Sequence, residues 1–98
     1  MGKLARRAAK RDKNEPEIMQ ALKAVQCTVQ QLSDEGVPDL LVGFTDPQTG
    51  QRSMILMEVK DGYNKLTPPQ AEWHLWWGGT CPVIVRSIED ALRAIGRA

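Results

Sequence analysis

Residues 53–60 read Ser-Met-Ile-Leu-Met-Glu-Val-Lys, and this stretch decides the fold. Apolar residues occupy both alternating faces of an extended segment here, which is typical of a strand in the middle of a covered sheet. Glu58 and Lys60 are two positions apart, so they project from the same face of that strand. Burying an acid and a base is costly unless they are paired or bound to a metal, so the two residues indicate a site rather than a core position.

A second acid stands before another apolar run. Residues 36–42 read Gly-Val-Pro-Asp-Leu-Leu-Val, so Asp39 lies at the start of a predicted strand that continues to Phe44. Residues 46–50, Asp-Pro-Gln-Thr-Gly, carry two strong turn signals and predict a hairpin loop. A hairpin makes its two strands neighbours, so the sequence predicts that Asp39 and Glu58 lie close together.

The remaining segments predict three helices and two further strands around this hairpin. Capping residues and early prolines mark helix starts, and short apolar or alternating runs mark strands. The predicted elements are a helix over 14–25, strands over 27–31, 39–44 and 53–60, a helix from 67 that stops before 78, a strand over 82–85 and a helix over 87–95. This order, α-β-β-β-α-β-α, defines an α/β domain with a four-stranded mixed sheet flanked by helices.

The composition is that of one small globular domain. The chain has 98 residues, of which 42% are apolar and 26% charged, so it is neither disordered nor rich enough in apolar runs to span a membrane. Leu4 and Ala5 are followed at once by two arginines, which is unlike a secretory signal, and we expect a cytoplasmic protein. His74 is the only histidine, which excludes a Cys/His zinc site.

Charge is distributed unevenly along the chain. Residues 1–13 hold six basic residues against one acid, whereas the other 85 residues hold seven basic residues and eleven acids. We therefore divide the chain into a basic arm or helix, 1–13, and a single domain, 14–98. A basic arm on a mildly acidic body suggests a polyanion as partner, the alternative being a solubilising tail. The candidate DNA-binding residues are Lys3, Arg6, Arg7, Lys10, Arg11 and Lys13, together with Lys65 in a predicted loop.

Two carboxylates and a lysine at strand ends fit metal-assisted phosphodiester hydrolysis. Mg²⁺ and Mn²⁺ prefer carboxylate, carbonyl and water oxygens, and they stabilise the charge that develops on the phosphate. Asp39 and Glu58 can supply the carboxylates and Val59 its backbone carbonyl, while Lys60 can position the attacking water or offset phosphate charge. Glu17, on the preceding helix, is a candidate further carboxylate.

Each of these residues also has a purely structural interpretation. Glu58 and Lys60 can form an ordinary ion pair, and Asp39 can cap a turn. Glu17 and Gln70 fit the capping positions of their helices equally well. The joint pattern, and no single residue, therefore indicates a site.

The joint pattern resembles a known family of nucleases. Pro38-Asp39, then eighteen residues, then Glu58-Val59-Lys60, is similar to the PD-(D/E)XK nuclease signature. The order of the surrounding motifs resembles the VRR-NUC branch, the virus-type replication-repair nucleases. The matching segments, which span the body from about Glu17 to Leu92, are residues 36–41, 57–60, 65–70, 79–85 and 87–91.

The resemblance implies a fold, a reaction and a set of roles. The fold would be the restriction-endonuclease-like αβββαβ core, and the reaction a Mg²⁺- or Mn²⁺-dependent cleavage of DNA. Asp39, Glu58 and the Val59 carbonyl would bind metal, Lys60 would be the catalytic lysine, and Glu17 the helix-borne acid. Gln70 would orient site groups or a phosphate.

Small standalone members of this branch occur in phages and bacteria, and are associated with cleavage of branched DNA, including four-way (Holliday) junctions, as homodimers. The resemblance thus implies a bacterial, phage or prophage protein of DNA repair with structured DNA as its substrate. The alternatives are a less selective DNA endonuclease or nickase, and a catalytically silent nucleic-acid-binding protein of the same fold.

Three tryptophans within five positions favour a dimer. Trp73 and Trp77 share one predicted helix face, and Trp76 points elsewhere. Tryptophans are used both in cores and at interfaces, and three are many for so small a core. One of them, with Leu75 or Val83, is a candidate contact with a second copy, and two symmetric cuts at a junction would need such a two-fold dimer.

Overall fold

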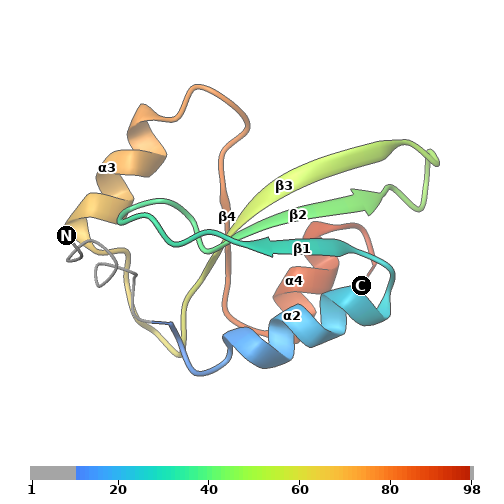
Figure 1. Cartoon of the computed structure of the whole chain (residues 1–98), viewed down its shortest axis with the longest axis horizontal. Coiled ribbons are helices and arrows are strands. Elements are labelled where there is room, and N and C mark those ends of the chain that lie inside the picture. The colour runs from blue at the N-terminus through green and yellow to red at the C-terminus, as the bar shows by residue number, and fades with distance from the viewer. Residues whose placement is uncertain (1–10, 98) are drawn as a thin grey trace, which may run out of the picture.

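The computed structural model describes residues 11–97 and has the predicted α/β architecture (Figure 1). The order of elements along the chain, α-β-β-β-α-β-α, is the predicted one. They are α2 (Glu15–Ala24), β1 (Thr28–Gln31), β2 (Leu40–Thr45), β3 (Arg52–Val59), α3 (Pro68–Trp76), β4 (Val83–Val85) and α4 (Ile88–Ala94).

The four strands form one mixed sheet in the order β1-β2-β3-β4. The β1–β2 and β2–β3 pairs are antiparallel and the β3–β4 pair is parallel, so the predicted hairpin and the predicted mixed sheet are both confirmed. In the β2–β3 ladder Leu40 pairs with Met57. The next step of this register brings Asp39 opposite Glu58, on the same face of the sheet.

One face of the sheet is buried beneath α2 and α4 (Figure 1). Apolar side chains from every second position of β2 and β3 point to these helices, as the period of a strand requires. Together with residues of the helices and β4 they form the core, which comprises Ile18, Leu22, Cys27, Leu40, Val42, Met57, Val59, Val85, Ala91 and Ile95. This layer fixes the register that brings the two acids together.

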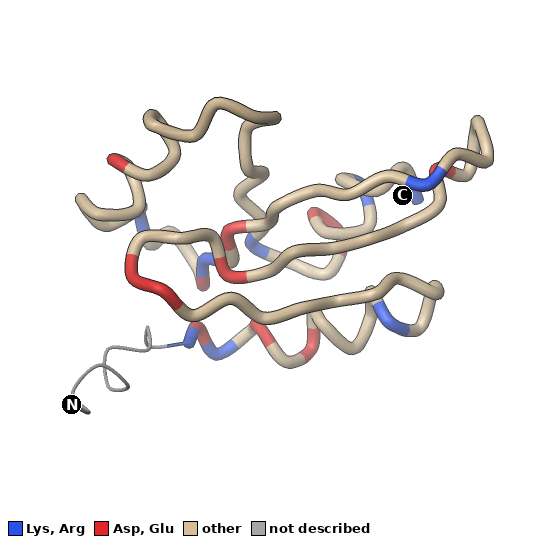
Figure 2. Tube along the Cα trace, turned by 45° about the horizontal axis from the view of Figure 1, so that its top comes forward, with Lys and Arg blue, Asp and Glu red and all other residues tan. Residues whose placement is uncertain are grey.

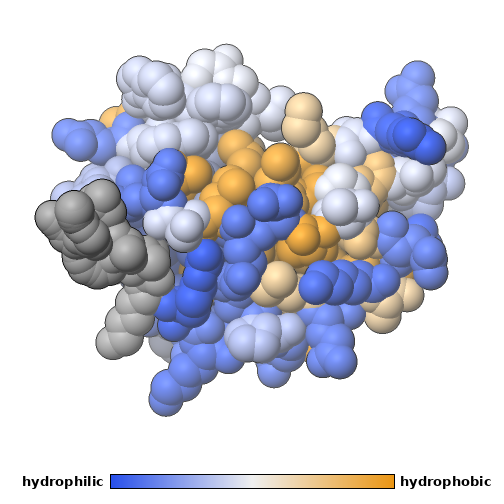
Figure 3. Space-filling view, viewed as in Figure 1, coloured by the Kyte–Doolittle hydropathy of each residue, from blue (hydrophilic) through white to orange (hydrophobic). Residues whose placement is uncertain are grey.

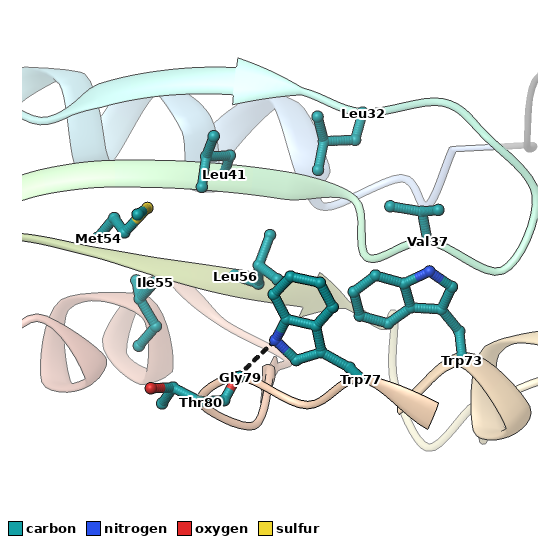
Figure 4. A pocket seen from close by; sticks show the side chains of 10 residues that line it. All are labelled: Leu32, Val37, Leu41, Met54, Ile55, Leu56, Trp73, Trp77, Gly79 and Thr80. Atoms are coloured by element: carbon teal, nitrogen blue, oxygen red, sulfur yellow. Dashed lines mark hydrogen bonds between the residues drawn. The ribbon is translucent and has the colours of Figure 1, made fainter. Parts of the chain in front are cut away.

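The other face of the sheet is only partly covered. The prediction from residues 53–60 was a strand with both faces buried, but Met54 is 71% exposed. Figure 3 shows the resulting apolar surface between the strands and α3. This surface contains a hollow of about 490 Å³. In Figure 4 the stacked rings of Trp73 and Trp77 form one wall of the hollow. The opposite wall is lined by Leu32, Leu41 and Leu56.

Helix α3 lies at the end of the sheet where β3 finishes. Thr67 and Gln70 form the predicted capping box, and two prolines occupy its first turn. None of its residues is fully buried, so its tryptophans do not belong to the core. Trp73 and Trp77 stack at 4.9 Å between ring centroids, as their shared face predicts, whereas Trp76 is 73% exposed.

Gly36, in the loop before β2, packs closely against the first turn of α3. Its φ of +84° is one that residues with a side chain avoid, and a Cβ at this position would lie 2.9 Å from the carbonyl oxygen of Pro69. Gly36→Ala is expected to lower the free energy of unfolding by about 2 kcal/mol or more, since strain and a backbone clash add. Chemical denaturation measures this, with Gly50→Ala, also at positive φ but with open space around it, as the comparison. Equal losses in the two variants would show that contact with α3 is unimportant.

No helix within residues 11–97 has the length and apolar character needed to cross a membrane.

Candidate metal-dependent active site

The acidic residues of the hairpin gather at one end of the sheet. Figure 2 shows acidic positions side by side where β2 begins and β3 ends. Asp39 is 5% exposed, Glu58 is fully buried and Lys60 is 6% exposed, so the structure brings the three predicted residues together in a sheltered place. All three belong to the sheet face opposite the core.

Asp39 is held by donors from two directions. The backbone N–H of Val59 donates to its Oδ2 at 2.8 Å, which ties the carboxylate to the strand that carries Glu58. The Arg11 guanidinium lies 3.4 Å from its Oδ1. The side chain therefore does not merely cap a turn, because it crosses to the neighbouring strand.

One carboxyl oxygen of Glu58 contacts a histidine, and the other has no hydrogen-bond partner in the described residues. Its Oε1 lies 3.1 Å from Nε2 of His74, and its Oε2 is buried without a hydrogen-bond partner in the described residues. Burial raises the pKa of Glu58 to about 9, as does repulsion from Asp39, although Lys60 opposes this shift. Glu58 therefore carries a proton near neutral pH when no cation neutralises it.

Lys60 is positioned through its backbone. Its N–H donates to the carbonyl of Val85 at 3.0 Å, and the side-chain amide of Asn14 donates to its carbonyl at 3.2 Å. The same amide also donates to the carbonyl of Arg86. Asn14 occupies the N-cap position of α2, but its side chain makes no capping bond and instead fixes the strand end that carries Lys60.

The helix-borne acid in this cluster is Glu15, and Glu17 is not part of it. Glu17 is exposed on α2, whereas Glu15 is 1% exposed and accepts hydrogen bonds from Arg11 and Gln31. Burial raises the pKa of Glu15, as does the charge of Asp39, while Gln31 and Arg11 lower it. The sequence carried a signal for this, because Glu15 lies on the same helix face as the core residues Ile18 and Leu22.

Arg11 also differs from its predicted role. We grouped it with the DNA-binding arm, but its guanidinium contacts Glu15 and Asp39 and donates to the carbonyl of Leu32 at 2.8 Å. It therefore neutralises the acidic cluster from within the domain, and the predicted boundary after residue 13 falls inside the site. Lys13 is exposed, as expected of a phosphate contact, and so is Lys65. Lys3, Arg6, Arg7 and Lys10 lie outside the described residues.

Gln70 lies on the helix that faces the site, but its side chain serves the helix. Its Oε1 accepts from the N–H of Thr67 at 2.9 Å, which is the structural alternative considered for it above. His74, one turn further along α3, reaches Glu58 instead.

The oxygen ligands at this site suit a hard cation, although they are few. Within residues 11–97 no three His, Cys, Asp or Glu side chains form a group that would hold a metal by themselves. Asp39 and Glu58 nevertheless offer two carboxylates beside the Val59 backbone, and buried Oε2 of Glu58 and Oε1 of Glu15 have no partner in this part of the chain. Unpaired buried oxygens at this position fit a bound cation that needs further ligands from water or phosphate.

Comparisons of the chain with models of protein families, with curated proteins and with solved structures found no match. The resemblance to the VRR-NUC branch therefore remains a prediction from the motifs.

Proposed function

We propose that this protein is a divalent-metal-dependent DNA endonuclease that acts on branched DNA such as four-way junctions. The observation that carries the proposal is the buried pair Asp39–Glu58, one of whose oxygens has no partner in the described residues, beside the buried Lys60. Three ionisable groups in so sheltered a place cost stability, which is typical of a catalytic site. The motif order adds the VRR-NUC branch as the expected family.

Different residues of the site would have different roles in hydrolysis. Asp39, Glu58 and the carbonyl of Val59 would hold Mg²⁺ or Mn²⁺. When bound, such a cation offsets phosphate charge and acidifies the attacking water. Lys60, buried next to Glu58, supplies a fixed positive charge that orients the water and stabilises negative charge on the phosphate. Arg11 contacts both Glu15 and Asp39 and compensates these carboxylates in the metal-free protein.

A direct assay tests the proposal. Labelled linear, nicked, flap and four-way DNA are incubated with the protein in Mg²⁺, Mn²⁺ or EDTA, beside Glu58→Ala. We expect metal-dependent cleavage that is fastest on the four-way junction and absent in the variant. Equal cleavage of all four substrates would favour the less selective endonuclease or nickase, and binding without cleavage under every condition would favour the silent nucleic-acid-binding protein.

The basic arm is expected to add affinity that depends on salt. Removing residues 1–10 deletes Lys3, Arg6, Arg7 and Lys10 but keeps Arg11 and its contacts in the site. If all four contact phosphates, the slope of log K against log salt should fall by about 3–4. Fluorescence anisotropy with labelled junction DNA between about 50 and 200 mM salt measures the slope. An unchanged slope would identify the arm as a solubilising tail.

The apolar hollow beside α3 supports the expected homodimer. Leu75 is 89% exposed and Trp76 73%, next to a hollow walled by Trp73 and Trp77, and this much exposed apolar surface is typical of an interface. Light scattering at micromolar concentration is expected to give twice the 10.9 kDa of one chain. Trp76→Lys should shift the mass toward the monomer, with Ile88→Lys, a partly exposed site on α4, as the control. A wild-type mass of 10.9 kDa would remove the dimer from the proposal.

A further inference from the structure

The contact between His74 and Glu58 links α3 to the site. Nε2 of His74 lies 3.1 Å from Oε1 of Glu58, and the imidazole side chain is only 15% exposed. It is the one hydrogen bond that the described residues make to this carboxyl oxygen, while the other oxygen, Oε2, is buried and free. The imidazole therefore fixes which oxygen of Glu58 remains available.

The fold holds the imidazole firmly in this position. Thr67 and Gln70 cap the first turn of α3, and His74 follows Gln70 by four residues, on the same side of the helix. The ring of Trp73 meets the imidazole edge to face, with 6.4 Å between centroids. The capped helix α3 thus places the imidazole against the end of β3.

The chemistry of the partners defines the direction of the hydrogen bond. A carboxylate that binds a cation is ionised, so its oxygens can only accept hydrogen bonds. Oε1 of Glu58 therefore needs a donor, and Nε2 of His74 lies within hydrogen-bonding distance of it. The Nε2–H tautomer satisfies both groups at once.

We propose that His74 is a positioning residue, whose Nε2–H donates to Oε1 of Glu58 and so directs Oε2 toward Asp39, where a divalent cation binds. The inference rests on the proposed function, because it assigns the group that orients one of its metal ligands. Carboxylates that bind metals are commonly oriented by such hydrogen bonds, and losing one typically weakens metal affinity by about 10- to 100-fold. Nothing in the VRR-NUC motifs quoted above assigns a role to this histidine.

The test compares variants by metal binding without DNA. His74→Leu keeps the bulk but removes the donor, His74→Gln keeps a donor, and Glu72→Ala removes an exposed acid from the same helix. Mn²⁺ binding is followed by the electron paramagnetic resonance of the free ion. We expect His74→Leu to weaken binding about 10- to 100-fold, His74→Gln to restore it to within about threefold, and Glu72→Ala to match wild type.

The remaining outcomes separate failure of the positioning role from failure of the proposed function. Wild-type affinity in His74→Leu, or failure of His74→Gln to restore binding, would overturn the positioning role and leave the proposed function intact. If wild type binds no Mn²⁺ and cleaves no DNA, the proposed function and this inference both fall.

A measurement on the unaltered protein covers the case that His74→Leu does not fold. His74 is the only histidine, so its two ring nitrogens can be assigned without mutation by ¹⁵N NMR. We expect the proton on Nε2 both without metal and with saturating Mg²⁺. A proton on Nδ1 with a bare Nε2 in the Mg²⁺-saturated protein would overturn the inference.

Discussion

Glu58→Gln is expected to abolish metal-dependent DNA cleavage and at the same time to stabilise the metal-free protein above neutral pH. The loss of cleavage, about 10³-fold or more, follows because Gln provides a neutral amide where a carboxylate must bind the cation. The gain in stability follows because a buried acid beside a second acid is costly once it ionises. Opposite effects on activity and stability are the signature of a site that is strained for function.

The raised pKa of Glu58 determines how the free energy of unfolding changes with pH. Folding raises the pKa of Glu58 from 4.5 to about 9, so between these values the folded chain holds a proton that the unfolded chain has lost. The free energy of unfolding of wild type should therefore fall as pH rises from 4.5 toward 9. Glu58→Gln lacks this proton and should exceed wild type by about 2–4 kcal/mol at pH 8, but by little near pH 4.5.

Urea denaturation without metal at the two pH values measures the difference, with Glu72→Gln as an exposed control on α3. A variant less stable than wild type at pH 8 would contradict the buried, repelled carboxyl.

Lys60→Met is expected to separate cleavage from metal binding. Methionine keeps much of the buried stem but removes the ammonium, so the charge that orients water and stabilises the phosphate is lost. We expect cleavage to fall by about 10²- to 10⁴-fold. Mn²⁺ binding should persist or tighten, because removing a positive charge next to Glu58 removes repulsion of the cation.

Single-turnover cleavage and a Mn²⁺ titration on the same preparation give both quantities. Lys65→Met, at an exposed loop position, is the matched control for losing a lysine, and it should retain cleavage at saturating protein with at most weaker DNA binding. Full cleavage by Lys60→Met would remove this residue from the mechanism, and loss of Mn²⁺ binding would show that it supports the fold of the site instead.

The hairpin and its chemistry could be predicted because their signals are local. Alternating apolar positions, the Asp46–Gly50 turn and the position of Asp39 determine the β2–β3 register, and that register alone brings Asp39 to Glu58. The helix order followed from caps and prolines in the same way. The α/β class and the mixed sheet were therefore predicted correctly.

The side-chain contacts of the site could not be predicted, because they depend on partners that are distant in the sequence. Asn14 has the residue type and place of a helix cap, yet it bonds to two strand-end carbonyls that are distant in sequence. Arg11 belongs to a basic run but is drawn into the acidic cluster by Glu15 and Asp39. Glu17 was predicted as the helix-borne acid from the resemblance, whereas the helix face decides that Glu15 is the buried acid. His74 was visible only as a lone histidine, since no local signal aims it at Glu58.

The central claim is that Asp39 and Glu58 bind a divalent cation, and calorimetric titration with Mn²⁺ tests it most directly. At pH 7.5 the protein is titrated in two buffers with different enthalpies of ionisation, so that the number of protons released is obtained with the affinity. Since Glu58 carries a proton in the metal-free protein, binding should release about one proton per cation, and Glu58→Gln should show neither binding nor release. Equal Mn²⁺ binding by Glu58→Gln, or no binding by wild type, would contradict the account.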